Sequence, residues 1–174
     1  MTLSINDYLL LIVSAIAGIS DLKGGKIFNR LTYPAIASGF LLSAAGGEVS
    51  PTDAAAGFAV GFIPLFFVNR MGGIGGGDVK LMGALGALAG YPAILHIMFY
   101  SFLLGGVVAF SIVTWQGHFK EVMRRIAWNV FFLGVPGPKV FIEGNADYKM
   151  PFGFAICMGV LWTSVLKILN ISLV

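Results

Sequence analysis

Apolar segments follow one another along almost the whole chain, separated by short polar or glycine- and proline-containing breaks. Most are close to the roughly 20 residues that a helix needs to cross a bilayer. They do not show the shorter, alternating pattern of spanning strands. The pattern therefore predicts an all-α polytopic membrane protein with about six transmembrane helices. The expected spans are residues 8–20, 31–45, 54–68, 79–89, 92–114 and 152–169.

The fourth apolar segment, residues 79–89, is unusually short and is interrupted by Gly83 and Gly86. Eleven helical residues rise only about 16 Å, which is less than the thickness of a bilayer core. Small residues allow helices to approach closely inside a membrane bundle. We therefore expect this segment to be packed within the bundle.

Residues 118–128 have a different pattern, with apolar positions on one helical face and basic ones outside it. Such an amphipathic helix is expected to lie in the membrane interface. A polar connection, residues 134–150, follows it and leads to the last span.

Composition supports a membrane location and excludes several other classes. Hydrophobic residues make up 57% of the chain and charged residues only 11%, with a mean hydropathy of +0.89. The sequence predicts one integral-membrane domain over residues 1–174, without a removable signal peptide. The single cysteine, Cys157, cannot form an intrachain disulfide or a zinc site, and no basic patch indicates nucleic-acid binding.

The distribution of basic residues predicts the topology. With six spans and an outer N-terminus, ten of the eleven Lys and Arg residues fall on the cytoplasmic side, and only Lys167 lies near the outer end. The outer turns contain acidic residues, among them Asp7, Glu48 and Asp53. This topology places Asp21, at the end of the first span, and Asp78, at the start of the fourth, at the same cytoplasmic level.

A glycine run ending in an acid, Gly75-Gly76-Gly77-Asp78, is the strongest candidate for chemistry. Carboxylates at membrane depth are expensive and often functional. Two carboxylates that share one proton can act as base and acid on a peptide bond, and Asp21 is the expected partner. The glycines would let an extended substrate backbone approach the acid.

Alternatively, each aspartate could simply cap or end a helix. A phosphate-binding loop is disfavoured because the Gly-Lys-Ser/Thr pattern is absent.

These residues resemble a known family. The glycine run with Asp78 fits the GxGD motif of intramembrane aspartyl proteases, and Asp78-Val79-Lys80-Leu81 is similar to the version in type IV prepilin peptidases. The basic loop after Asp21, with Asn29-Arg30-Leu31-Thr32, and Pro151-Phe152-Gly153 near the last span also match that family. The resemblance extends from about residue 8 to residue 169, and the three motifs occur in the family's order.

The resemblance implies an aspartic endopeptidase of the cytoplasmic (inner) membrane that cleaves the leader peptide of type IV, tight-adherence-like prepilins at the cytoplasmic face. Asp21 and Asp78 would be catalytic, with no metal or other cofactor, and partners other than prepilin and the bilayer are not implied. The chain looks like the short class without the zinc-binding N-terminal methyltransferase region. The residues expected to bind substrate are Gly75, Gly76, Gly77, Lys80, Pro151, Phe152 and Gly153.

Two other functions remain open on the sequence alone. A small proton- or cation-coupled transporter or channel subunit could also need two membrane acids. Such transporters often contain two related halves, and no repeat is visible here. A non-catalytic pilus-assembly subunit is the third possibility. The oligomeric state does not follow from the sequence.

Overall fold

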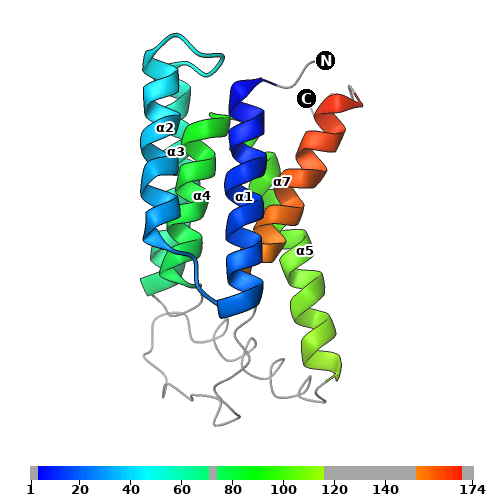
Figure 1. The fold of residues 1–174 in the computed structure, drawn as a ribbon. Helices are drawn as coiled ribbons and strands as arrows, with labels where there is room; N and C mark the ends of the chain where they lie inside the picture. Colours follow the sequence, from blue (N-terminus) through cyan, green and yellow to red (C-terminus); the bar gives the residue numbers. More distant parts are fainter. Residues whose placement is uncertain (1–3, 71–73, 116–151, 170–174) are drawn as a thin grey trace. The chain divides into compact units, whose positions relative to one another are not determined.

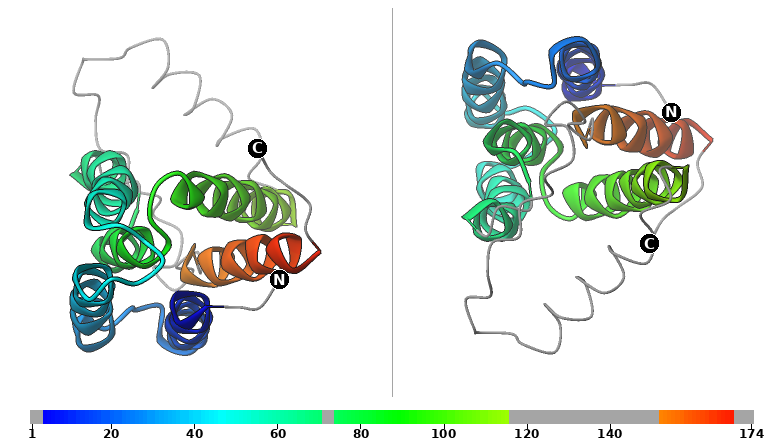
Figure 2. Two further views of the ribbon diagram at one scale, coloured as in Figure 1. Left: turned by 90° about the horizontal axis from the view of Figure 1, so that it is seen from above. Right: turned by 90° about the horizontal axis from the view of Figure 1, so that it is seen from below.

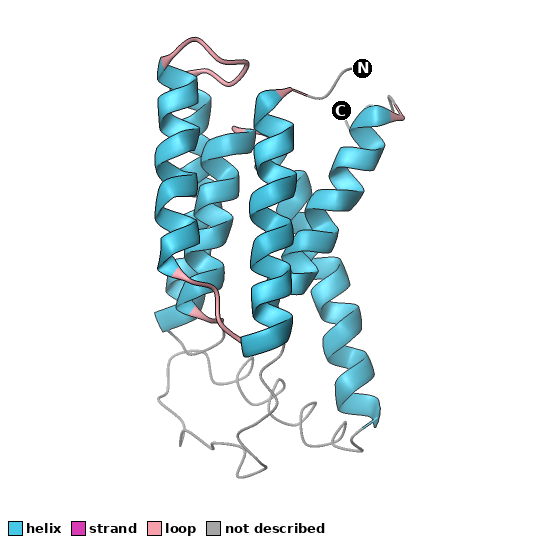
Figure 3. Ribbon diagram, viewed as in Figure 1, coloured by secondary structure: helices cyan, strands magenta, loops and turns pink. Residues whose placement is uncertain are grey.

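A computed structural model describes residues 4–70, 74–115 and 152–169. All regular structure in these ranges is helical, which confirms the all-α class (Figure 3). The helices are α1 (Ile5–Gly24), α2 (Asn29–Ala44), α3 (Pro51–Arg70), α4 (Gly76–Ala89), α5 (Ala93–Trp115) and α7 (Phe152–Ile168).

Within the described ranges, three helices are long and apolar enough to cross a membrane: α1, α3 and the part of α5 from Ala93 to Ser111. The apolar helix α7 is shorter. The structure thus supports a membrane protein, whereas a count of six spans remains a prediction. The expected interfacial helix, 118–128, and the polar connection, 134–150, lie outside the described residues.

The chain divides into two compact units. Residues 1–105 and 151–174 form the first, which contains α1 to α4, most of α5 and α7. Residues 106–150 form the second, of which the structure describes only the last turns of α5. The elements below belong to the first unit.

The short helix α4 is the central element of this unit and contacts α1, α2, α3 and α7 (Figures 1 and 2). Its residues from Leu81 to Leu88 are all buried. Close backbone approach makes this possible, because a Cβ on Gly86 would overlap the carbonyl oxygen of Gly57 in α3. A Cβ on Gly39 of α2 would lie 2.8 Å from the Cβ of Ala87. The expectation that glycines pack this helix inside the bundle is therefore confirmed.

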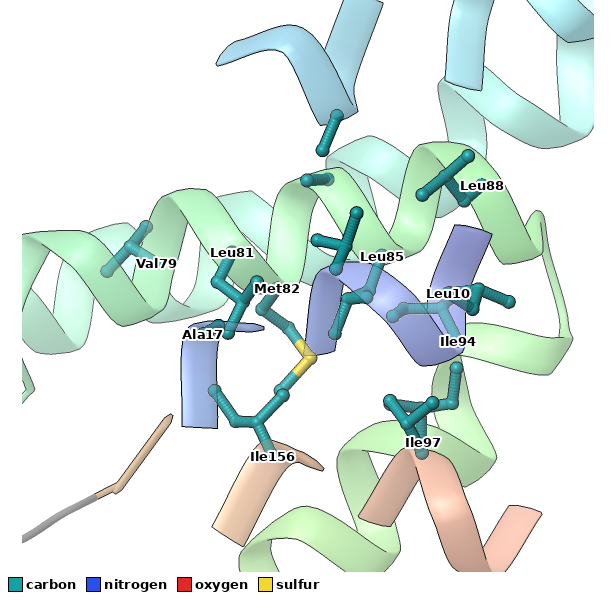
Figure 4. Packing of buried hydrophobic residues seen from close by; sticks show 14 of the residues in the cluster. Leu10, Ala17, Val79, Leu81, Met82, Leu85, Leu88, Ile94, Ile97 and Ile156 are labelled. Atoms are coloured by element: carbon teal, nitrogen blue, oxygen red, sulfur yellow. The ribbon is translucent and has the colours of Figure 1, made fainter. Parts of the chain in front are cut away.

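The apolar core forms where α4 meets α1 and α7. Met82 and Leu85 belong to a buried cluster that also contains Leu10 of α1 and Ile156 of α7 (Figure 4). Outer helix faces are apolar as well: Ile12, Ile16 and Ile19 follow one face of α1 and are about half exposed. A row of exposed isoleucines suits contact with lipid rather than water.

Candidate active site

Three helix ends lie at the same end of the first unit: the end of α1 and the beginnings of α4 and α7 (Figure 1). α1 runs in the opposite direction to α4 and α7, so segments far apart in sequence meet there. Asp21, Asp78 and Gly153 are the residues of interest, and each lies in a terminal turn of its helix.

Asp21 is buried and contacts the first turn of α7. Its Oδ2 accepts a hydrogen bond of 2.7 Å from the backbone N–H of Gly153. Free N–H groups and the positive end of the dipole at a helix start stabilise negative charge. The sequence placed the end of the first span at Asp21, but α1 continues to Gly24. Gly25 is its C-cap. The left-handed φ of 58° at Gly25 suits a residue without a Cβ, and the Gly25 N–H donates a hydrogen bond to the carbonyl oxygen of Asp21.

Asp78 lies in the first turn of α4, just before the apolar stretch that begins at Val79 and outside the three candidate spans. Its Oδ1 is buried and has no hydrogen-bond partner among the described residues. Burial raises the pKa of Asp78 to about 7, the negative charge of Asp21 acts in the same direction, and a hydrogen bond from the Gly75 backbone offsets part of the rise. A protonated Asp78 is the form that this environment favours near neutral pH.

The two aspartates are thus close enough to interact electrostatically, although 56 residues separate them in sequence. The linker between α1 and α2 connects their surroundings through Ile27. A Cβ on Gly77 would lie 3.0 Å from the Cβ of Ile27, and one on Gly153 would lie 2.9 Å from its Cδ1. Ile27 therefore lies between the beginnings of α4 and α7, beside both acids.

Most of the glycine run is part of a helix. Gly75 is the N-cap of α4 with an ordinary φ of −68°, and Gly76 and Gly77 are already helical. Positive φ occurs instead at Gly25, Gly46 and Gly90 within the described residues. Conformational freedom is therefore the wrong reason for these glycines. Close approach does apply to Gly77, but the group that approaches it here is Ile27.

Lys80 points to α2. Its Nζ donates hydrogen bonds to Asn29 Oδ1 (2.9 Å) and Tyr33 OH (3.1 Å), and it lies over the Tyr33 ring. Phe28 is the N-cap of α2, and Asn29 is its first helical residue. Lys80 and Asn29 thus join the beginnings of α4 and α2.

The Pro-Phe-Gly motif divides into residues with different surroundings. Pro151 lies outside the described residues. Phe152 begins α7 and packs its ring against Phe102 of α5, with 5.6 Å between centroids. Gly153 contacts a catalytic candidate, Asp21. The substrate-binding roles expected of these residues, of the glycine run and of Lys80 remain predictions.

Two contributors to the site were not identified from sequence. Ile27 has no chemical signal, and Tyr33 could be found only by knowing that α2 lies beside Lys80. Across the described ranges, no group of three or more His, Cys, Asp or Glu side chains is arranged to hold a metal ion.

Comparison with known proteins identifies the family. The type IV leader peptidase family matches residues 8–110, more than half of the chain. The prepilin leader peptidase/N-methyltransferase of Aeromonas hydrophila is 31% identical over 108 residues, which are 58% of this chain and 37% of that protein. The protein of the same name from Xanthomonas campestris pv. campestris is 31% identical over 134 residues, 69% of this chain and 46% of the relative.

A third relative of that name, from Burkholderia pseudomallei, is 30% identical over 118 residues, 64% of this chain and 37% of the relative. The chain thus spans less than half the length of these curated relatives. No solved structure matches it significantly. Both candidate aspartates lie within the matched region, and the chain belongs to the type IV leader peptidase family.

Proposed function

We propose that this protein is an intramembrane aspartyl endopeptidase that removes the leader peptide of type IV prepilins. One observation carries the proposal: two carboxylates, from α1 and α4, interact so that the charge of Asp21 contributes to a raised pKa of Asp78. Family membership and the family name of the relatives support the choice of a prepilin as substrate.

The surroundings favour different protonation states for the two acids. The Gly153 N–H at the beginning of α7 stabilises an ionised Asp21. Asp78 favours the protonated form near pH 7, and its Oδ1 has no partner in the described part of the chain. We therefore assign Asp21 as general base and Asp78 as general acid, the two roles that an aspartyl protease requires.

In the proposed reaction, Asp21 removes a proton from a water molecule, and the oxygen of that water attacks the scissile carbonyl carbon. Asp78 donates its proton to the carbonyl oxygen, which gives a neutral tetrahedral diol. Collapse of the diol returns a proton to Asp78 while Asp21, protonated by the water, gives its proton to the leaving amine. The peptide bond breaks, one water is consumed, and both acids regain their starting states.

The same proposal includes the location of the site. A single membrane domain with six spans in the inner (cytoplasmic) membrane would place both acids at the cytoplasmic face, where the positive-inside distribution puts them. The burial of α4 from Leu81 to Leu88 supports its place inside a helix bundle, although α4 is too short to be a candidate span by itself. Labelling single cysteines at positions 50 and 144 from opposite sides of the membrane tests this topology.

The proposed function is tested by Asp21→Asn, Asp78→Asn and the double variant, using a prepilin from the same organism purified in detergent. Each single variant should lose at least about a thousandfold in cleavage rate, and the double variant should lose no more, because residues that act as one unit are not additive. Cleavage is followed by gel shift and by mass spectrometry of the new N-terminus.

Asp53→Asn is the matched control, because Asp53 lies in the first turn of α3 and caps that helix with Ser50. It should cleave at nearly the wild-type rate. Near-wild-type cleavage by either active-site variant would refute the dyad. Proton flux through proteoliposomes, without cleavage by the wild type, would favour the transporter alternative, and neither activity would favour an assembly subunit.

A further inference from the structure

The far end of the α1–α7 pair contains a second polar contact. Lys167 Nζ, in the last turn of α7, donates to Asp7 Oδ2 at 2.6 Å and to Asp7 Oδ1 at 2.9 Å. The Asp7 side chain is 11% exposed and that of Lys167 is 43% exposed. Neither residue belongs to the proposed catalytic machinery, and Lys167 is the one basic residue that the predicted topology places on the outer side.

The spacing of the two contacts is the same on both helices. Asp7 and Asp21 are 14 residues apart, and so are their partners Gly153 and Lys167. Fourteen residues make almost four helical turns, about 21 Å of rise, so each pair of positions lies on one face of its helix. The two antiparallel helices are therefore joined at both ends in a single register.

The interface between these two contacts includes small residues. Gly18 packs against Cys157 so closely that a Cβ on Gly18 would lie 2.9 Å from the Cβ of Cys157. Small residues give a smooth contact, and lipid supplies no hydrophobic force to hold helices in one position. Single polar pairs can set the register of helix pairs.

Register matters at the inner end because the contact there is short. A slide of α7 by one residue moves its backbone by about 1.5 Å along the axis. That shift would separate the Gly153 N–H from the Asp21 carboxylate, which now lie 2.7 Å apart. Misplacement of about 1 Å at a catalytic group can cost about a hundredfold in rate.

We propose that the Asp7–Lys167 ion pair is a register lock, which holds α7 against α1 so that the Gly153 N–H meets Asp21. This inference rests on the proposed function, and it makes Asp7 and Lys167 positioning residues. The simpler role is helix-end stabilisation: Asp7 forms a capping box with Ser4, and each charge suits its own helix dipole.

Four variants separate the two roles: Lys167→Arg, Lys167→Met, Asp7→Asn, and the double variant Asp7→Asn/Lys167→Met. Lys167→Met leaves a buried acid unpaired, so it should lower both thermal stability and kcat. The double variant contains no unpaired charge and should regain most of the stability. Its kcat should nevertheless stay about tenfold or more below wild type, with KM changed by less than about twofold, because the lock is absent. Lys167→Arg keeps the cation and should retain activity.

Register is also measured directly, without activity. Ser14 lies one turn before Gly18 on the face of α1 that packs against Cys157, so Ser14→Cys should form a disulfide with the native Cys157 under mild oxidation. The double variant should slow this cross-link severalfold, whereas Lys167→Arg should not.

Recovery of kcat together with stability in the double variant, or unchanged cross-linking, would overturn the register lock. Absence of prepilin cleavage by the wild type would instead refute the proposed function, and the cross-linking rate would still test the lock.

Discussion

The two ends of α1 present the same chemical group in opposite circumstances. Asp7 and Asp21 lie on one face of the helix, and each contacts α7. Asp7 meets a lysine, so its charge is neutralised. Asp21 meets a backbone N–H, and a second carboxylate, Asp78, lies within electrostatic reach.

The difference separates an acid that stabilises from one that can react. At the outer end, the Asp7 carboxylate is paired with Lys167 and also caps α1 through Ser4, so both of its contacts are structural. At the inner end, Asp21 accepts the Gly153 N–H hydrogen bond and its negative charge acts on Asp78, so a proton on Asp78 relieves the repulsion between the two carboxylates. We infer that the repulsion between two carboxylates, rather than burial, marks the candidate active site, since both Asp7 and Asp21 are buried.

Among the changes that test this comparison without replacing an acid, breaking the inner contact should have the largest effect. In Gly153→Ala, the new Cβ would lie 3.0 Å from both Cβ and Oδ2 of Asp21 and 2.9 Å from Ile27 Cδ1. Because at least one of these groups must move, we expect kcat for prepilin cleavage to fall about a hundredfold or more. Thermal unfolding in detergent should show that the protein still folds.

Gly24→Ala is the matched control for this substitution. Gly24 is also helical and lies three residues after Asp21, but nothing lies within 4 Å of its added Cβ. Its cleavage rate should stay within about twofold of wild type. Equal rates for the two alanine variants would mean that the contact between Gly153 and Asp21 is irrelevant to catalysis.

Changing the protonation state of Asp78 by pH should have the next largest effect. If Asp78 is the general acid, cleavage requires its proton, which is bound below its pKa of about 7 and lost above it. The rate should therefore fall as pH rises through about 7, by about tenfold per pH unit at the alkaline limit. A kcat profile that stays level up to pH 9, in a protein that remains folded, would exclude Asp78 as the acid.

The sequence predicted the parts of the fold that depend on local pattern. Hydrophobic length and glycine spacing identified the helices and the buried position of α4, because both follow from the apolar and small residues of each segment. Helix ends were less accurate: α1 extends beyond Asp21 and α4 begins within the glycine run, since tertiary contacts and capping decide those turns.

The site was predictable only in part, for a similar reason. Asp21 and Asp78 could be proposed because membrane acids are rare and costly. Three features depend on which helices are neighbours, and no local pattern contains that information. They are the interaction of the two acids, the place of Ile27 between the beginnings of α4 and α7, and the partners of Lys80. The ion pair of Asp7 and Lys167 had a visible signal, the one basic residue expected on the outer side, but its partner required the register of α1 and α7.

The smallest expected effect concerns stability, and it has opposite signs at the two ends. The pKa of Asp78 rises from 3.8 to about 7 on folding, so the folded state binds the proton more tightly than the unfolded state. Wild-type stability should therefore fall as pH rises from about 4 to about 7, and Asp78→Asn should avoid that loss. The Asp78→Asn variant should unfold several degrees above wild type at pH 8 and at the same temperature as wild type near pH 4.

Asp7→Asn, which breaks an ion pair, should unfold below wild type at pH 8. Thermal unfolding in detergent at both pH values measures the two shifts. A lower unfolding temperature for Asp78→Asn at pH 8 would show that the folded protein stabilises an ionised Asp78, as Lys167 stabilises Asp7.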